Sequence, residues 1–139
     1  MTYNDTNTPP FRADHVGSLL RPKRLLAARD RFANGDISSI DLREIEDECI
    51  TDSIKKQEDC GLKAVTDGEL RRTTWHYDFL CALDGIEQSA PPQGPNFKAG
   101  HNINSLAVSK KVKNLNGIMI DHFRYVKEKS KVIAKFCIP

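Results

Sequence analysis

The chain has 139 residues, with 21 Lys and Arg against 19 Asp and Glu, which leaves a net charge of +2. Hydrophobic residues make up 39% and charged residues 29%, so the composition excludes an intrinsically disordered chain and favours one ordinary domain. The sequence has no apolar run as long as the roughly 18 residues that a membrane span needs. It also has no long run of basic residues, which would indicate nucleic acid as a partner. The polar opening MTYNDTNTPP lacks the features of a secretory signal, so we expect a cytoplasmic protein.

The first part of the chain predicts a tail, a strand and a helix. Residues 1–10 are expected to form a flexible polar tail. Residues 11–18 (FRADHVGS) predict a short strand that runs into a Gly-Ser turn. Pro22 suits the first turn of a helix, and Gly35 suits its C-terminal stop. The inner face of this helix is expected to include Leu25, Leu26, Arg29 and Phe32.

A second, longer helix has the clearest signals. Asp41, with Glu44 three residues later, resembles a capping box at its start. The apolar residues of its inner face recur at roughly helical spacing: Leu42, Ile45, Cys49 and Ile54. Gly61 then ends the helix. The short apolar run over residues 62–66 predicts a strand that stops before Asp67.

The second half of the chain predicts a helix, a long loop, a hairpin, a helix and a strand. Four large apolar residues at helical spacing are expected to pack on the core: Trp75, Phe79, Leu80 and Leu83. Proline and glycine cluster in residues 84–102, which predicts a long loop. Residues 105–118 predict a hairpin with Asn116-Gly117 as its turn. A helix from residue 120 and a strand in the closing KVIAKFCIP follow.

This order of elements indicates an α/β fold. Two crossovers from a helix to a strand imply a parallel sheet that is covered by helices. Parallel strands buried on both faces have short, continuous apolar runs, and the segments near residues 64 and 134 have this character.

The cysteines and histidines show no metal-binding spacing. No two of Cys49, Cys60, Cys81 and Cys137 form a CxxC motif, and the four histidines contain no HxxxH. In a chain without a secretory signal, free buried thiols are favoured over disulfides. The local sequence therefore predicts no metal site in this chain.

Two predicted strand ends carry residues that suit ligand binding, since ligands of parallel α/β folds bind where the strands end. The first is His15-Val16-Gly17-Ser18, which offers backbone N–H groups and a hydroxyl for a carboxylate or a phosphate. An ordinary tight turn is the alternative interpretation of the same residues.

The second strand end is TDGELRR, residues 66–72. Gly68 lets the backbone turn so that Glu69 can face a pocket, where a carboxylate suits the ammonium group of a ligand. Arg71 or Arg72 could neutralise Glu69 or bind an anion. A solvated turn held by salt bridges is the alternative here.

Three runs of the sequence resemble the cobalamin-independent methionine synthase family, and in particular its short, single-barrel branch. These runs are HVGSLLRP (15–22), QEDCGLKAVTDGELRRTTW (57–75) and KFCIP (135–139). The resemblance implies the N-terminal part of a (β/α)8 TIM barrel, with about three barrel strands, helices and a hairpin or loop insertion. Because a complete barrel takes roughly 250 residues, residues 11–139 are expected to be an incomplete barrel domain.

The resemblance also implies a function, which is zinc-dependent methyl transfer to the thiol of homocysteine, giving methionine. Such an enzyme is like a 5-methyltetrahydropteroyltriglutamate–homocysteine S-methyltransferase, and its methyl donor is a folate or another compound. Its zinc ion binds the thiol of homocysteine and favours the thiolate, which is the better nucleophile. Val16, Gly17 and Ser18 would contact the amino-acid end of homocysteine, and Glu69 would hold its ammonium group. Three neighbours are expected to support this site: His15, Asp67 and Arg72.

The chain departs from the long enzymes of the family at several positions. Asp67 stands where those enzymes have His, and Leu19-Leu20 stand where they have Phe-Pro. The zinc ligands of the family lie beyond the third strand and include a His-x-Cys motif, which this chain lacks. The resemblance therefore implies that the zinc ligands are not in this chain, and that the isolated chain is inactive.

Two alternative functions stay open. Epoxyalkane–coenzyme M transferases are similar to the short branch, and in them a thiolate opens an epoxide. Glu69 favours homocysteine, because a site for homocysteine needs a partner for its amine. The other alternative is a non-catalytic truncated chain or small binding module, which predicts neither zinc uptake nor methyl transfer.

Overall fold

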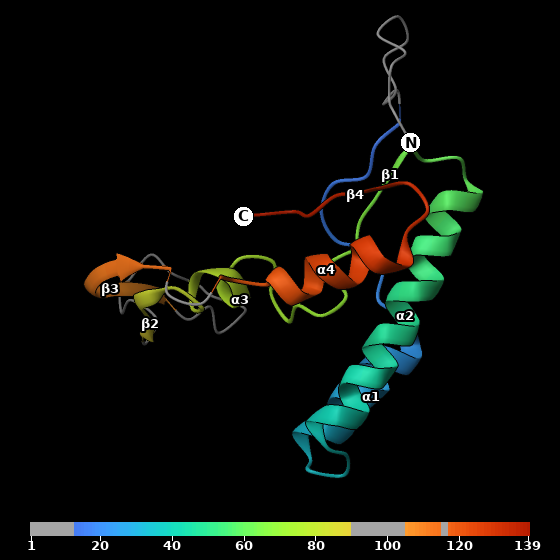
Figure 1. Ribbon diagram of the computed structural model, residues 1–139. Coiled ribbons are helices and arrows are strands. Elements are labelled where there is room, and N and C mark those ends of the chain that lie inside the picture. Colours follow the sequence, from blue (N-terminus) through green and yellow to red (C-terminus); the bar gives the residue numbers. More distant parts are fainter. Residues whose placement is uncertain (1–12, 90–104, 115–116) are drawn as a thin grey trace, which may run out of the picture. The chain divides into compact units, whose positions relative to one another are not determined.

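The computed structural model describes residues 13–89, 105–114 and 117–139. They form two compact units: unit 1 holds the described residues up to Arg72 together with Asp121–Ile138, and unit 2 holds those of Thr73–Ile120. The elements in chain order are α1 (Lys23–Ala33), α2 (Ser39–Asp59), β1 (Ala64–Val65), α3 (Tyr77–Leu80), β2 (Asp84–Ser89), β3 (Ser105–Lys113), α4 (Ile120–Lys129) and β4 (Ile133–Ala134) (Figure 1).

Unit 1 contains a pair of parallel strands, β1 and β4. Ala64 is opposite Ile133 and Val65 is opposite Ala134. Lys135 N also donates to Val65 O at 2.8 Å, just beyond the paired residues. The predicted parallel arrangement is confirmed, and the described residues form a mixed α/β fold.

Helices α1 and α2 lie side by side in unit 1 (Figure 1), and α2 begins earlier than the sequence predicted. Ser38 is its N-cap: the hydroxyl accepts from Asp41 N at 3.2 Å, and the Asp41 carboxylate accepts from Ser38 N at 2.8 Å. The capping box predicted at Asp41 and Glu44 is therefore wrong, because Ser38 has the extended backbone that an N-cap needs and Asp41 already lies inside the helix. The predicted helix ends, just before Gly35 and Gly61, are confirmed.

The hydrophobic core joins both of these helices to β1 and α4. Its buried members are Leu25, Cys49, Ile50, Ile54, Val65, Leu70 and Val126. Leu42 and Ile45, on the predicted inner face of α2, are partly buried against this core. On α1, Leu26 and Phe32 are 46% and 43% exposed, so the buried face of that helix is narrower than its apolar spacing predicted.

The strand predicted for residues 11–18 is absent from residues 13–18, the part of that segment that the structure describes. The backbone turns at Gly17, where φ is +87°, and His15 Nε2 lies 2.8 Å from Gly17 O across the turn. A strand needs backbone partners on a neighbouring strand, and β1 pairs with β4 instead.

Unit 2 contains an antiparallel pair, β2 and β3, in which Ile86 is opposite Val108. The hairpin predicted within residues 105–118 is therefore wrong, because β3 pairs with the segment that precedes it. Residue 116 of its predicted turn lies outside the described residues. The predicted loop over residues 84–102 is wrong at its start, where β2 forms, and its residues 90–102 also lie outside the description.

Gly85 allows the two strands of unit 2 to approach closely. A Cβ atom added at this residue would lie 2.8 Å from Lys110 O, which is closer than real Cβ atoms come to a carbonyl. The sequence analysis counted Gly85 as a loop signal, whereas a glycine inside a strand can also mark such a close approach.

The helix predicted around Trp75 is short, since α3 covers only Tyr77–Leu80. Trp75 itself is 59% exposed, and the expectation that it packs on the core is wrong. Phe79, Leu80 and Leu83 are half-buried but do not belong to the core cluster, because that cluster lies in unit 1 and these residues lie in unit 2.

Within the described residues, no helix combines the length and the apolar composition that crossing a membrane requires.

Replacing Ser38 by alanine is expected to lower the free energy of unfolding by about 1 kcal/mol, because the variant loses the hydroxyl that accepts from Asp41 N. Urea unfolding followed by circular dichroism measures the change. Ser39→Ala is the matched control: this exposed residue is the first of α2, and its variant should stay within about 0.5 kcal/mol of the native chain. Equal losses in both variants would contradict the capping role.

Candidate functional site

The turn that follows β1, residues 66–72, buries several charged side chains. Asp67, Glu69 and Arg72 are 1%, 4% and 1% exposed. An ion in such surroundings costs several kcal/mol unless it is paired and hydrogen-bonded. The alternative of a solvated turn is therefore wrong, and the partners of these groups define the site.

Gln57 of α2 anchors the start of this turn to the helix. Its side-chain carbonyl accepts from Thr66 N at 3.0 Å, and its side-chain NH2 donates to Thr66 O at 2.9 Å. Both residues are buried, at 6% and 0% exposed, so no water competes for these two backbone groups. The sequence analysis included Gln57 only as the first residue of the run QEDCGLKAVTDGELRRTTW. No local pattern in the sequence indicated that its side chain binds Thr66.

The turn itself has an unusual backbone that Asp67 and Gly68 make possible. Glu69 has a positive φ of 56°, and its N–H donates to Asp67 Oδ1 at 3.0 Å. Gly68 has a φ of 61°, and a Cβ added there would lie 2.8 Å from Leu19 Cδ1. Leu19 N donates to Gly68 O at 3.0 Å, so a glycine is required for the segment before α1 to lie against the turn.

This contact brings together the two binding motifs that the sequence placed at separate strand ends. Ser18 Oγ donates to Glu69 Oε2 at 2.7 Å. The residues are 51 positions apart in the chain. Ser18 is exposed while Glu69 is buried, so the pair lies at the boundary between solvent and the interior of unit 1.

Arg72, rather than Arg71, is the arginine that neutralises Glu69. Its Nη1 lies 3.7 Å from Glu69 Oε1. Its Nη2 donates to Cys137 O, just after β4, and its guanidinium lies over the Phe136 ring at 5.2 Å from the centroid. Arg72 therefore joins the turn after β1 to the segment after β4.

Two further arginines bind the backbone carbonyls at the end of the turn. Arg21 Nη2 donates to Arg72 O at 2.8 Å, and Arg29 Nη1 donates to the same oxygen at 3.0 Å. Arg29 Nη2 also donates to Leu70 O at 2.7 Å. The turn is thus held by side chains from α1 and from the residues just before it.

The remaining residues of the first motif have different surroundings. Gly17 N donates to Cys137 Sγ at 3.5 Å, which makes Cys137 a neighbour of the site that the sequence analysis missed. His15 contacts Gly17 O two residues along the chain, as described above. Val16 is 76% exposed, so its side chain adds no buried contact to the site.

The two carboxylate oxygens of Asp67 differ in their hydrogen bonding. Asp67 Oδ1 accepts from Glu69 N, whereas Oδ2 is buried and has no hydrogen-bond partner among the described residues. The role of Asp67 that the structure describes is thus to stabilise the backbone that presents Glu69.

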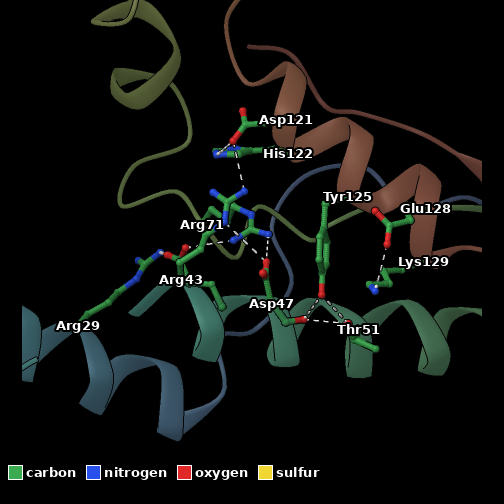
Figure 2. Close-up of polar contacts among 11 residues, drawn as sticks. Arg29, Arg43, Asp47, Thr51, Arg71, Asp121, His122, Tyr125, Glu128 and Lys129 are labelled. Carbon is green, nitrogen blue, oxygen red and sulfur yellow. Dashed lines mark hydrogen bonds and ion pairs between the residues drawn. The ribbon is translucent and has the colours of Figure 1, made fainter. Parts of the chain in front are cut away.

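Arg71 belongs to a separate network between α2 and α4, which Figure 2 shows in close-up. Its Nη1 lies 3.3 Å from Glu46 Oε2, and its Nη2 pairs with Asp47. Its guanidinium lies over the Tyr125 ring of α4, 5.1 Å from the centroid, and Tyr125 Oη donates to Asp47 O at 3.0 Å. Arg71 thereby stabilises the packing of the turn on these helices.

Burial sets the ionisation of two groups in this network. It raises the pKa of the Glu46 carboxyl, and the guanidinium groups of Arg71 and Arg29 oppose this rise. Burial lowers the pKa of His122, which Figure 2 shows next to Asp121. The charges of Arg71 and Arg43 lower this pKa further, against the opposing effects of Asp121 and Asp67.

A cleft of about 520 Å³ lies beside the site, lined by residues that include His15, Leu19, Gln57 and Leu70. Its lining contains neither Ser18 nor Glu69, so the cleft and the Ser18–Glu69 pair are separate features of unit 1. The four cysteines are free thiols, of which Cys49 is buried and Cys60 is exposed.

Gln57→Glu is expected to lower the free energy of unfolding by at least about 2 kcal/mol, because a carboxylate cannot donate to Thr66 O and adds a buried charge. Urea unfolding of the two proteins measures the difference. Glu44→Gln, an exchange between the same residue types at an exposed position of α2, should change stability by less than about 0.5 kcal/mol. A Gln57→Glu variant as stable as this control would rule out the anchoring role.

The lowered pKa of His122 predicts a loss of stability in acid. The unfolded chain binds the imidazole proton more readily than the folded chain, so the stabilisation present above the ordinary pKa of about 6.5 is lost as the pH falls through the lowered folded value. The native chain should therefore lose more unfolding free energy between about pH 7.5 and 5.5 than His122→Gln loses. Urea unfolding at the two pH values tests this, and identical slopes would contradict it.

Comparisons with known proteins add the relatives of this chain. No protein-family model matches the sequence. The chain is 50% identical over 103 residues to the uncharacterized protein YxjH of Bacillus subtilis, and 30% identical over 117 residues to a methionine synthase of Sulfurisphaera tokodaii. These alignments cover 74% and 83% of this chain, but only 26% and 33% of the relatives.

A solved structure resembles the chain over most of its length. This is the crystal structure of a Listeria monocytogenes protein provisionally assigned as a vitamin-B12 independent methionine synthase, with a TM-score of 0.72 and 38% sequence identity. The match covers 90% of this chain and 35% of that protein, so the chain spans about a third of its relatives or less. The three runs of motif sequence, the α/β fold and these relatives agree, and the chain is similar to about a third of the length of proteins of the cobalamin-independent methionine synthase family.

Proposed function

We propose that the chain binds the amino-acid end of homocysteine, or of a similar small thiol, for a methyltransferase that takes its methyl group from a folate or another donor. The observation that carries the proposal is the 2.7 Å hydrogen bond between Ser18 Oγ and Glu69 Oε2. It brings a hydroxyl and a carboxylate within the span of one α-amino acid, whose two charged groups are attached to the same carbon.

The chemistry of the two partners matches the two ends of such a ligand. The Glu69 carboxylate can accept charge-assisted hydrogen bonds from an ammonium group. The Ser18 hydroxyl and the Gly17 N–H can both donate to a carboxylate. Glu69 is 4% exposed, and charged hydrogen bonds are stronger in such surroundings than in water.

The position of the site in the fold also supports this function. The turn with Glu69 follows β1, and Cys137 follows β4, so both lie beyond the C-terminal ends of two parallel strands. Active sites of (β/α)8 barrels lie at this end of the strands. We propose that β1 and β4 are neighbouring strands of such a barrel.

The described residues do not fit the zinc ion that the family implies. They contain no cluster of three or more His, Cys, Asp or Glu side chains that could hold a metal ion. The function proposed for this chain is therefore amino-acid binding, and no step of methyl transfer is assigned to its residues.

Glu69→Gln is expected to weaken homocysteine binding by about ten- to a hundredfold, the usual effect of losing a hydrogen bond to a charged group. The variant keeps a side-chain oxygen that can accept from Ser18, so the turn should remain folded. Isothermal titration calorimetry of the full chain with homocysteine measures the affinity. The ligand 4-mercaptobutanoate, which lacks only the ammonium group, should bind the two proteins with similar affinity.

Glu44→Gln is the matched control and should bind homocysteine as the native chain does, because Glu44 is exposed on α2. Native affinity of Glu69→Gln for homocysteine would refute the proposed site. Tighter binding of coenzyme M than of homocysteine would favour the epoxyalkane transferase alternative, since coenzyme M carries no ammonium group.

A further inference from the structure

The cleft of about 520 Å³ in unit 1 has a volume that suits a small molecule, since such sites measure roughly 300–1,000 Å³. It is lined by one face of α2 and by residues in and just before the first turn of α1. Cys49, Ser53, Lys56 and Cys60 of α2 line it at helical spacing. The cleft therefore follows α2 over about three turns, which favours an elongated ligand.

Aliphatic side chains form much of the other walls of the cleft. They are Leu19, Leu20, Pro22, Leu62 and Leu70. Leu20 is 97% exposed, so a ligand that covers it removes apolar surface from water, which is favourable. The body of a matching ligand is therefore apolar.

The uncharged polar side chains of α2 in the cleft already have partners within the protein. The side-chain NH2 of Gln57 donates to Ser53 O at 3.2 Å and to Thr66 O at 2.9 Å. Its side-chain oxygen accepts from Thr66 N at 3.0 Å. Gln57 and Ser53 are both buried. They therefore require no polar group from a ligand.

Arg24, one of the cations that line the cleft, has its charge balanced by carboxylates. Its Nη1 donates to Glu48 at 3.2 Å and its Nη2 donates to Asp52 at 2.7 Å. Its Nε donates to Cys49 Sγ at 3.2 Å. All three nitrogens are thus engaged, and the two carboxylates beside them oppose the approach of an anion.

Lys56 is the other lining cation of α2 and α1, and its surroundings differ. Within the described part of the chain, no carboxylate pairs with its ammonium group. Lys56 is exposed on the last turn of α2, so a ligand can reach it from solvent. A single ammonium group beside an apolar cleft matches a ligand with a single negative charge.

We propose that this cleft binds a monocarboxylate with an aliphatic chain, such as a medium-chain fatty acid. The chain covers the leucine side chains, and the carboxylate pairs with Lys56. This inference does not rest on the proposed function, because neither Ser18 nor Glu69 lines the cleft.

The first test varies the ligand. Octanoate should bind the native chain about tenfold more tightly than hexanoate, because it adds two methylene groups to the buried chain. Octan-1-ol keeps the aliphatic chain but lacks the charge, and should bind more weakly than octanoate. Isothermal titration calorimetry of the full chain measures these affinities. The absence of octanoate binding, or equal affinities for hexanoate and octanoate, would overturn the proposal.

The second test varies the protein. Lys56→Gln should weaken octanoate binding about fivefold, as expected for an exposed ion pair, and should leave octan-1-ol binding unchanged. Lys55→Gln is the matched control, since Lys55 is exposed on the same helix but does not line the cleft. Equal losses of octanoate affinity in the two variants would show a general effect of charge and would refute the pairing with Lys56.

A third variant tests the apolar wall. Leu20→Asp replaces an exposed side chain, so the fold should be kept, and it should weaken octanoate binding about tenfold through lost apolar contact and like charge. Native octanoate affinity of this variant would refute the assignment to this cleft. Sedimentation of the native chain and of Leu20→Asp covers a different occupant. A native dimer that this variant abolishes would show that a second copy fills the cleft, and would overturn the proposal.

Discussion

The structure of unit 1 depends on how the chain partners the charges that it buries after β1. Four charged side chains of one turn are each less than a tenth exposed: Asp67, Glu69, Arg71 and Arg72. Since an unpaired ion there would cost several kcal/mol, the turn recruits hydrogen bonds and ion pairs from residues 18–21, α1, α2 and the segment after β4. These contacts are directional, whereas hydrophobic packing is not. They therefore define how the turn lies against the other segments of unit 1.

The parallel pairing of β1 with β4 gives this turn its place in the unit. Parallel strands end at the same edge, so the turn that starts at Thr66 and the residues after Ala134 meet there. Arg72 can then reach Cys137 O, and Gly17 N can reach Cys137 Sγ. The candidate site is thus assembled from three segments that are distant in the chain, which is how parallel α/β folds build sites on a rigid sheet.

Adjacent arginines in this turn have separate roles because the backbone directs them to different surroundings. Arg71 pairs with Glu46 and Asp47 of α2 and lies over Tyr125 of α4, which stabilises the helix packing (Figure 2). Arg72 faces Glu69 and the segment after β4 instead. One arginine therefore stabilises the unit while its neighbour sets the charge balance of the candidate site.

The sequence by itself predicted helices α1, α2 and α4, the parallel strands β1 and β4 and the two candidate binding motifs, because glycine stops and apolar periodicity act over a few neighbouring residues. It placed the cap of α2 at the wrong residue, and it predicted a strand over residues 11–18 that the described part of that segment lacks. It did not predict that β3 pairs with β2, since strand pairing joins residues without a local signal. Only the tertiary structure decided that Ser18 donates to Glu69, that Arg72 rather than Arg71 faces this carboxylate, and that Gln57 and Cys137 border the site. The physical reason is that most of these contacts join segments that are distant in the chain. Such segments meet only when β4 pairs with β1 and the turn after β1 is buried.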